Sequence, residues 1–345
     1  MKALVMHEYK KLELQDVPDP EYSDDEVLVR IHACCVCGSD VHGFDGSTGR
    51  RLPPVIMGHE ASGVIAACGK NVTEYRIGDR VTFDSTIYCG RCDKCKAGMF
   101  NLCRERQVLG VSCEEYSRDG CFAEYVSIPK HILYRLPDSV TYVQAAMAEP
   151  LSVAYHAATR VSIGPDDSIA VIGVGTIGLL TLQVVHAFGA KRIIAVDIDE
   201  RRLEAARSCG AAACIDSSKP QAAEQIRAAA GDGADIVFDA TGIDATVNLC
   251  VQSVKPGGRV VLIGNIAPEI KLPLQKVVTG QISLFGSCAS AGEYPECLDL
   301  IASHKVNVDT MISRVVPLRE GDLWMRKTYN RENGLNKICF DCTGV

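Results

Sequence analysis

The pattern of apolar and polar positions changes at about residue 150. Before Pro150, short apolar runs are separated by Pro and Gly, which is typical of β-strands joined by turns. Examples of these runs are residues 26–31, 63–65 and 80–83. The first part of the chain is therefore expected to form a small, irregular β-barrel.

After Pro150, apolar strands alternate with alanine-rich helical segments, which predicts a doubly wound parallel sheet. The six expected strands are residues 168–172, 192–196, 213–215, 235–239, 259–263 and 281–285. Helices are expected at residues 200–209, 221–230 and 245–254, followed by a turn at 255–258. The alternation stops near Ala289, so the expected domains are residues 1–153 with 289–345, and residues 154–288.

Length and composition favour a packed, two-domain protein. The 345 residues are 47% hydrophobic and 23% charged, which excludes a disordered chain. With 36 Lys and Arg against 43 Asp and Glu, the net charge of −7 disfavours a nucleic-acid partner. The apolar stretch 169–190 contains four glycines, so it is interpreted as strand, turn and helix, and no membrane association is expected.

The chain contains 17 cysteines, which in a secreted protein would suggest a disulfide framework. The apolar run after Lys2 ends at Met6, which is too short for the core of a signal peptide. We therefore expect a cytoplasmic protein whose clustered cysteines bind metal or do redox chemistry.

A glycine-rich motif, Gly173-Val-Gly-Thr-Ile-Gly178, directly follows the strand at 168–172 and opens a helical segment. Gly173 permits a tight turn, Gly175 lets a pyrophosphate approach the backbone, and Gly178 lets the helix pack on the strand. The helix N-terminal amides would hold the phosphates. The predicted cofactor-binding residues here are Gly173, Gly175, Thr176, Ile177 and Gly178.

Asp197 lies at the end of the next strand, where a carboxylate can accept both hydroxyls of an adenosine ribose. Its charge would repel a 2′-phosphate, so NAD is favoured over NADP. Arg201 and Arg202 leave NADP open, since either can pair with a phosphate, although Arg201 is interpreted as part of a solvated helix face. The alternative is a glycine-rich packing turn with Asp197 as a helix cap.

Four cysteines, Cys89, Cys92, Cys95 and Cys103, lie in a loop rich in Gly, Lys and Arg. Thiolates at these separations can close a tetrahedral site with no open position, which predicts structural zinc. The alternatives are reduced cysteines without metal, a redox pair, or a nucleic-acid-binding zinc finger. No recognition helix accompanies the basic residues of this loop, and no βαβ context suggests a redox pair.

A second set of candidate ligands comes from Cys37-Gly-Ser-Asp-Val-His42 and Gly58-His-Glu60. A thiolate, an imidazole and one or two carboxylate oxygens suit zinc, and three protein ligands leave a position for substrate or water. Neither fragment is specific when taken alone.

Taken together, these motifs resemble those of the zinc-dependent medium-chain alcohol and polyol dehydrogenases. The resemblance spans nearly the whole chain and includes Glu149-Pro150. It implies a GroES-like β-barrel catalytic domain, a six-stranded Rossmann domain, NAD, and one catalytic and one structural zinc. It also implies a homodimer or homotetramer that assembles through the nucleotide domain.

The resemblance also assigns roles to single residues. It makes Cys37 and His59 zinc ligands and Asp40 the carboxylate that orients the imidazole. Ser39 would hydrogen-bond the reacting alcohol, and His42 would be the outer member of a proton relay. Arg202 would join the aspartate at the adenosine ribose. The residues implied at the nicotinamide are Gly264, Asn265, Ser287 and Cys288.

Glu149 indicates which branch of this family the chain resembles. Simple-alcohol dehydrogenases have a second cysteine at this position, whereas sorbitol (L-iditol) dehydrogenase-like enzymes and threonine dehydrogenases have a glutamate. We expect Cys37, His59 and Glu60 to bind the metal, with Glu149 as a ligand or its nearest partner. Exchange between the two glutamates, and a helix-start role for Glu149, stay open.

The expected reaction is hydride transfer between NAD and a polyol or secondary alcohol, including sugar-derived alcohols. The alternatives are a threonine- or butanediol-type dehydrogenase and a noncatalytic regulator that binds NAD and zinc. The segment that contains Arg50-Arg51 borders the substrate pocket in the family, and Glu114, Glu115, Tyr116 and Arg118 form another variable loop. Arg50-Arg51 is interpreted as a solvated basic pair, with phosphate or carboxylate binding as the alternative.

Overall fold

The computed structural model describes residues 1–113, 116–332 and 334–345, which divide into two compact units. The first unit comprises residues 1–149, 290–303 and 308–345, and the second comprises residues 150–289 and 304–307. The division after Glu149 falls inside helix α4 (Ala148–Thr159), slightly before the expected boundary at residue 153. Glu114 and Glu115, from the variable segment at 114–118, lie outside the described residues.

The first unit is built on a seven-stranded sheet with the order β10-β6-β5-β3-β18-β17, in which β9 also pairs with β3. Its strands are β3 (Glu26–Cys35), β5 (Glu60–Cys68), β6 (Arg80–Phe83), β9 (Tyr125–Pro129), β10 (Leu133–Arg135), β17 (Ile312–Pro317) and β18 (Lys337–Asp341). A three-stranded sheet contains β1 (Lys2–Glu8), β2 (Lys11–Asp16) and β4 (Val55–Ile56), and a pair contains β7 (Thr86–Ile87) and β8 (Gln107–Val108). Strands from the end of the chain thus complete a sheet begun near its start.

Alternating side chains explain how the central strand β3 is buried on one face. Val27, Val29 and Ile31 are buried, whereas Arg30 between them is exposed, as the two-residue period of a strand requires. Phe340 of β18 packs against Phe122 with ring centroids 4.9 Å apart, so the C-terminal strand shares this core.

Short helices flank these sheets in the first unit. Helix α3 packs on β3 and β5, and α11 packs on α1 and β2. The helices are α1 (Gly38–Phe44), α2 (Asp93–Lys96), α3 (Tyr142–Ala146), α10 (Tyr294–Ala302) and α11 (Gly321–Tyr329), with 3₁₀ turns η1 (Phe100–Leu102), η2 (Lys130–Ile132), η3 (Asp309–Met311) and η4 (Leu318–Glu320).

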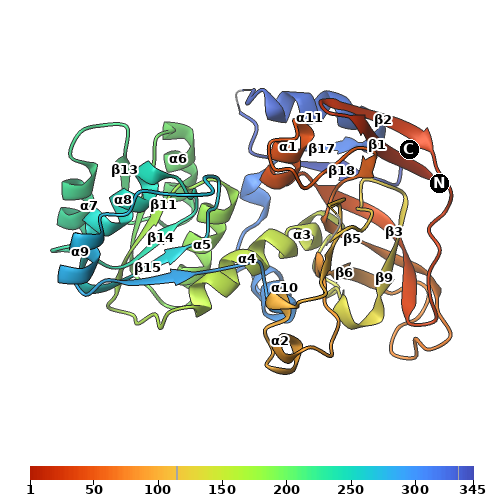
Figure 1. Ribbon diagram of the computed structural model, residues 1–345, viewed down its shortest axis with the longest axis horizontal. Helices are drawn as coiled ribbons and strands as arrows, with labels where there is room; N and C mark the ends of the chain where they lie inside the picture. Colours follow the sequence, from red (N-terminus) through yellow and green to blue (C-terminus); the bar gives the residue numbers. More distant parts are fainter. Residues whose placement is uncertain (114–115, 333) are drawn as a thin grey trace. The chain divides into compact units, whose positions relative to one another are not determined.

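The second unit contains a six-stranded parallel sheet with the order β13-β12-β11-β14-β15-β16 (Figure 1). This is the strand order of a dinucleotide-binding fold, with the reversal between β11 and β14. Its strands are β11 (Ser168–Ile172), β12 (Arg192–Asp197), β13 (Ala213–Asp216), β14 (Ala234–Asp239), β15 (Val254–Leu262) and β16 (Ser283–Gly286). The six strands and the doubly wound sheet predicted from the sequence are confirmed.

Helices cover both faces of this sheet, with α5 packed beside α6 and α7 beside α8. They are α5 (Thr176–Ala187), α6 (Glu200–Ser208), α7 (Ala222–Ala230), α8 (Asp244–Ser253) and α9 (Leu274–Thr279). Residues 255–258, where a turn is expected, fall within β15 but pair with no residue of β14, because Val254 pairs with Ala234 and Arg259 with Ile236, so the four residues between them bulge out of the sheet. Within the described residues, no helix is long and apolar enough to cross a membrane.

Candidate metal centres and nucleotide site

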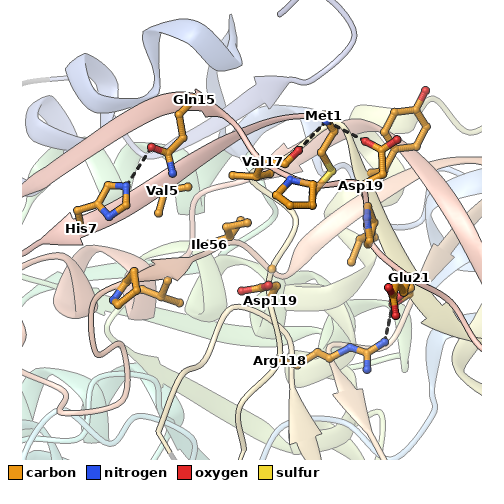
Figure 2. A pocket seen from close by; sticks show the side chains of 18 residues that line it. Met1, Val5, His7, Gln15, Val17, Asp19, Glu21, Ile56, Arg118 and Asp119 are labelled. Carbon is orange, nitrogen blue, oxygen red and sulfur yellow. Dashed lines mark hydrogen bonds and ion pairs between the residues drawn. The ribbon is translucent and has the colours of Figure 1, made fainter.

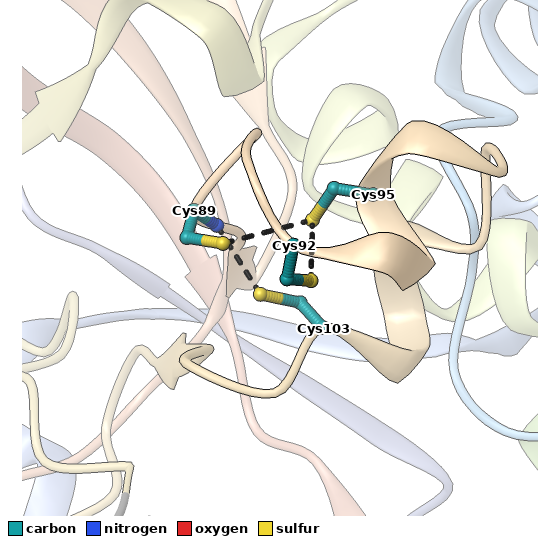
Figure 3. A group of neighbouring side chains, drawn as sticks. All are labelled: Cys89, Cys92, Cys95 and Cys103. Carbon is teal, nitrogen blue, oxygen red and sulfur yellow. Dashed lines mark hydrogen bonds between the residues drawn. The ribbon is translucent and has the colours of Figure 1, made fainter.

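The four cysteines of the lobe at residues 89–103 converge in space (Figure 3). Their sulfurs lie within 4.8 Å of one another, with Cys92 Sγ 3.5 Å and Cys89 Sγ 4.0 Å from Cys95 Sγ. Cys92 directly precedes α2 and Cys103 directly follows η1, so these two short turns fold the loop back on itself. Zinc–sulfur bonds of about 2.3 Å in a tetrahedron place sulfurs about 3.8 Å apart. The lobe therefore fits a four-thiolate zinc site.

Backbone N–H groups are directed at these sulfurs. The N–H of Cys89 lies 3.2 Å from Cys103 Sγ, and N–H groups of Arg104 and Cys95 lower the pKa of Cys92 to about 6. Burial and the neighbouring thiols raise the pKa of Cys95 to about 12. A cation bound among the four sulfurs would supply the positive charge that lets all of them lose their protons.

The second group consists of Cys37, His59 and Glu60, whose ligand atoms also lie within 4.8 Å of one another. Cys35 at the end of β3 pairs with Glu60 at the start of β5. Cys37 and His59 lie just beyond these paired ends, so strand register brings them together. Gly58, with φ of 92°, makes the turn that leads into β5. A thiol, an imidazole and a carboxylate are a donor set that suits zinc.

Asp40 is fully buried behind this group. It accepts hydrogen bonds from Cys37 N at 3.1 Å and Arg51 Nη2 at 3.0 Å, and it lies 3.5 Å from His59 Nδ1. Burial lowers the pKa of His59, but the charges of Asp40 and Cys37 raise it well above its usual value. The imidazole thus lies between Asp40 and the candidate ligand Cys37, as is typical of a metal-binding histidine, and its buried Nδ1, 3.5 Å from Asp40, has no hydrogen-bond partner among the described residues.

Arg51 corrects the expected solvated basic pair. Arg50 is exposed, but Arg51 is only 4% exposed and donates to Ser39 Oγ and Asp40 Oδ1, both at 3.0 Å. Its stem passes Gly43, where an added Cβ would lie 2.0 Å from Arg51 Cδ. The interpretation as a solvated pair is therefore wrong for Arg51. Because Gly43 on α1 has no side chain, the arginine has room to turn inward.

Lys337 was not identified from the sequence. It is buried at the start of β18 and donates to both carboxylate oxygens of Glu60 at 2.8 Å and to Val36 O at 3.1 Å. Burial lowers the pKa of Lys337, but the charge of Glu60 raises it above its usual range. The one available signal was a lysine leading into the apolar run 338–340, which is unusual unless the lysine is paired.

Glu149 is buried near this centre but lies outside the group of three. Its Oε1 accepts a hydrogen bond from Ser85 Oγ at 2.9 Å, and it lies in the first turn of α4. Burial and the charge of Glu60 raise its pKa, whereas His59 and Ser85 lower it. Ser85, which donates to Glu149, is after Lys337 the second residue of this centre that was not identified from the sequence.

Ser39 and His42 both lie on α1. Ser39 is partly buried and accepts the hydrogen bond from Arg51, whereas the side chain of His42 is exposed. One helix therefore presents a hydroxyl close to the metal ligands and an imidazole in contact with solvent.

The glycine-rich loop joins β11 to α5 in the second unit. Gly173 has φ of 84°, and an added Cβ would meet Thr241 Oγ1 at 2.1 Å. A Cβ on Gly178 would meet Gly173 O at 2.0 Å, whereas a Cβ on Gly175 would meet nothing within 4 Å. The first and last glycines permit close packing, and Gly175 faces open space of the kind a pyrophosphate needs. The first residues of α5 are Thr176, Ile177 and Gly178.

Asp197 ends β12 beside this loop. Its Oδ2 accepts Val174 N at 2.9 Å and lies 3.6 Å from Arg202 Nη1, and its Oδ1 accepts the next two backbone N–H groups. Arg201 is exposed and paired with Asp199, so its side chain lies on the solvated face, as expected. The carboxylate and Arg202 therefore lie together at the position predicted for the adenosine ribose.

The four residues predicted at the nicotinamide follow two neighbouring strands. Gly264 and Asn265 follow β15, Ser287 and Cys288 follow β16, and Ser287 N donates to Leu262 O at 3.0 Å. Ser287 Oγ is buried and has no hydrogen-bond partner among the described residues. An orphaned hydroxyl at the carboxyl edge of a parallel sheet fits a position where a ligand group completes the hydrogen bonding.

A separate cavity of about 650 Å³ lies in the first unit (Figure 2). It is lined by residues such as His7, Gln15, Asp19, Ile56 and Arg118 and contains none of the predicted site residues. His7 and Gln15 are hydrogen-bonded to each other at 3.0 Å.

Comparison with known proteins decides the family. Residues 23–138 match the alcohol dehydrogenase GroES-like domain, and residues 176–303 match the zinc-binding dehydrogenase model. The chain is 34% identical to sorbitol dehydrogenase of Bacillus subtilis over 343 residues, covering 98% of this chain and 96% of the relative. The chain belongs to the zinc-binding dehydrogenases.

Other relatives agree with this family. The zinc-binding dehydrogenase is 37% identical to the probable D-xylulose reductase A of Aspergillus clavatus, over 93% of this chain and 91% of the relative. Its structure matches alcohol dehydrogenase TADH from Thermus sp. ATN1 with a TM-score of 0.93 at 30% identity, over 99% of both chains. The predicted resemblance, and the GroES-like and dinucleotide-binding architecture it implied, are confirmed.

Proposed function

We propose that this zinc-binding dehydrogenase transfers a hydride between a polyol or secondary alcohol and NAD. The observation that carries the proposal is the group of Cys37, His59 and Glu60, with Asp40 oriented toward the imidazole. The names of the curated relatives, sorbitol dehydrogenase and D-xylulose reductase, support a polyol substrate.

We propose that these three side chains hold the catalytic zinc. When bound, zinc supplies a Lewis acid that makes a substrate hydroxyl easier to deprotonate. Ser39 would accept the hydroxyl proton as its own hydrogen leaves toward the outer member of the relay, His42, whose exposed imidazole on the same helix would pass a proton to solvent. Glu149, held by Ser85, supplies a second carboxylate near Glu60, as a further ligand or the nearest partner of the ligands.

The proposed cofactor is NAD, bound along the carboxyl edge of the parallel sheet. Open space at Gly175 accommodates the pyrophosphate, and Asp197 accepts the adenosine ribose hydroxyls while repelling a 2′-phosphate. Arg202 lies beside Asp197 and contacts the same ribose. The residues proposed to surround the nicotinamide are Gly264, Asn265, Ser287 and Cys288.

The four-cysteine lobe is proposed to hold a structural zinc. Four sulfur ligands leave no coordination position for substrate, so this metal would fix the fold of residues 89–103 and take no part in the reaction.

We further propose a cytoplasmic homo-oligomer, a dimer or a tetramer. Strand β16 ends the six-stranded sheet, and Ile266, Leu274 and Val278 in the same unit are each at least 60% exposed. None of the 17 cysteines, all of which lie within the described residues, forms a disulfide, which supports a reducing compartment. Light scattering after size-exclusion chromatography tests the assembly, and a monomer at micromolar concentration would contradict it.

The test of the reaction is the initial rate of NADH or NADPH formation by zinc-replete protein. The panel contains free polyols, their phosphates, sugar acids, threonine, butanediol and simple alcohols. We expect reduction of NAD with polyols and no activity in Cys37→Ser. Activity confined to threonine or butanediol would move the protein to another branch, and inactivity on the whole panel despite bound zinc and NADH would favour a regulator.

A further inference from the structure

Arg51 is a buried cation that the proposed reaction does not yet use. Its side chain is 4% exposed, and one nitrogen, Nη2, donates to both Ser39 Oγ and Asp40 Oδ1 at 3.0 Å. Its Nε is buried and has no hydrogen-bond partner among the described residues. Burying a guanidinium costs desolvation free energy, so its two remaining hydrogen bonds indicate what its buried position serves.

The bond to Asp40 neutralises charge, but the bond to Ser39 does not. A guanidinium has donors only, so Ser39 Oγ must act as the acceptor and cannot direct its own hydrogen at Arg51. One lone pair of the hydroxyl is thereby occupied, and its hydrogen is confined to directions away from the arginine. Ser39 is thus oriented before any substrate arrives.

The local backbone is adapted to this contact. Arg51 reaches α1 only because Gly43 has no side chain, since an added Cβ would lie 2.0 Å from Arg51 Cδ and 3.0 Å from its Nε. The neighbouring Arg50 is exposed and offers a matched arginine that lacks these contacts.

We propose that Arg51 is a positioning residue that orients the Ser39 hydroxyl for proton transfer and ties it to Asp40. The inference rests on the proposed dehydrogenase function and deepens it. Arg51 acts through Ser39 and is proposed neither as a metal ligand nor as a substrate contact. Loss of its guanidinium leaves the hydroxyl free to rotate, which lowers kcat more than it raises KM.

The test compares Arg51→Gln, Arg50→Gln, Ser39→Ala and the double variant Arg51→Gln with Ser39→Ala. We expect Arg51→Gln to lower kcat about 10- to 100-fold, as for other residues that orient a reacting group, with KM changed less than about threefold. Its zinc content should stay equal to that of the unmodified protein, and Arg50→Gln should match that protein in every respect. In the Ser39→Ala background, Arg51→Gln should cost less than about threefold, because the group it positions is gone.

Three results would overturn the inference: an unchanged kcat in Arg51→Gln, the same loss with and without Ser39, or loss of zinc with a normal rate per remaining zinc. If Arg51→Gln folds poorly, Arg51→Ala with added guanidinium ion replaces it. Guanidinium should restore kcat in Arg51→Ala but not when Ser39 is also alanine, and equal rescue in both would contradict the proposal. Absence of any alcohol oxidation by the unmodified protein would instead contradict the proposed function itself.

Discussion

The two groups of metal-ligating side chains in the first unit are held in different ways. In the cysteine lobe, all four ligands lie within residues 89–103, backbone N–H groups point at the sulfurs, and a nearby ion pair, Arg104–Asp93, is largely exposed. At the other centre, Arg51 and Lys337 neutralise two buried carboxylates from 11 and 277 residues away. A local site is built by one segment, whereas a buried charged site depends on distant parts of the chain.

The largest effect is expected for Cys37→Ser. Loss of a ligand at the buried centre should remove one of the two proposed zinc ions and lower kcat/KM by at least about 10³-fold, since metal catalysis contributes several kcal/mol. Elemental analysis and initial rates measure both quantities. Retention of both zinc ions with an unchanged rate would show that Cys37 is not a ligand.

The matched change in the lobe is Cys103→Ser. Cys103 is fully buried, and loss of its metal should lower the free energy of unfolding by about 4 kcal/mol, measured in urea. The rate per remaining zinc should stay within about threefold of normal, because this metal is proposed to take no part in the reaction. If Cys103→Ser lost activity as completely as Cys37→Ser, the two metal sites would not differ in their role in the reaction.

The difference between a site built by one segment and a site built from distant segments also explains which features can be predicted from the sequence. The lobe and the glycine-rich loop are visible because their residues are adjacent in the chain, and the six strands are visible because buried parallel strands are continuous apolar runs. Cys37, His59 and Glu60 were suggested by two separate fragments, but spacing could not place Glu60 inside the group and Glu149 outside it. That distinction depends on the pairing of Cys35 with Glu60.

Arg51 and Lys337 are the residues that sequence patterns do not reveal. An arginine beside another arginine resembles a solvated pair, and its burial depends on the missing side chain of Gly43. Lys337 reaches Glu60 only because β18 joins the sheet beside β3. A lysine that leads into an apolar run indicates that it is paired, but nothing local in the sequence identifies a partner on a distant strand.

A smaller effect, on stability, is expected when one cationic side chain is removed beside each metal site: Lys337 at the buried centre and Arg104 at the cysteine lobe. Lys337→Gln leaves Glu60 buried without its cation and should lower the free energy of unfolding of the metal-free protein by about 3 kcal/mol. Arg104→Gln, at an exposed pair, should produce no measurable change. Urea unfolding measures the free energy of unfolding of both variants. Equal values would mean that the buried Lys337–Glu60 pair contributes no more to stability than the exposed Arg104–Asp93 pair.

The smallest effect is expected at Asp84, in the segment between the two regions. Asp84 is buried, accepts Thr86 N at 2.8 Å and Ser290 Oγ at 3.3 Å, and burial together with the charge of Glu149 raises its pKa to about 7. Between about pH 4 and pH 7 the folded chain holds a proton that the unfolded chain has lost. Stability from this group is therefore present at low pH and decreases as the pH rises through this window.

Asp84→Asn removes the charge and keeps both hydrogen bonds, since the amide oxygen still accepts Thr86 N and the amide nitrogen can donate to Ser290 Oγ. The variant should match the unmodified protein near pH 5 and exceed its free energy of unfolding by about 2 kcal/mol at pH 8. Urea unfolding at both pH values measures this, with the exposed Asp138→Asn as control. If Asp84→Asn and the unmodified protein lose stability in parallel from pH 5 to pH 8, Asp84 is not the group that titrates, and the pH dependence must come from the metal centres on either side of it.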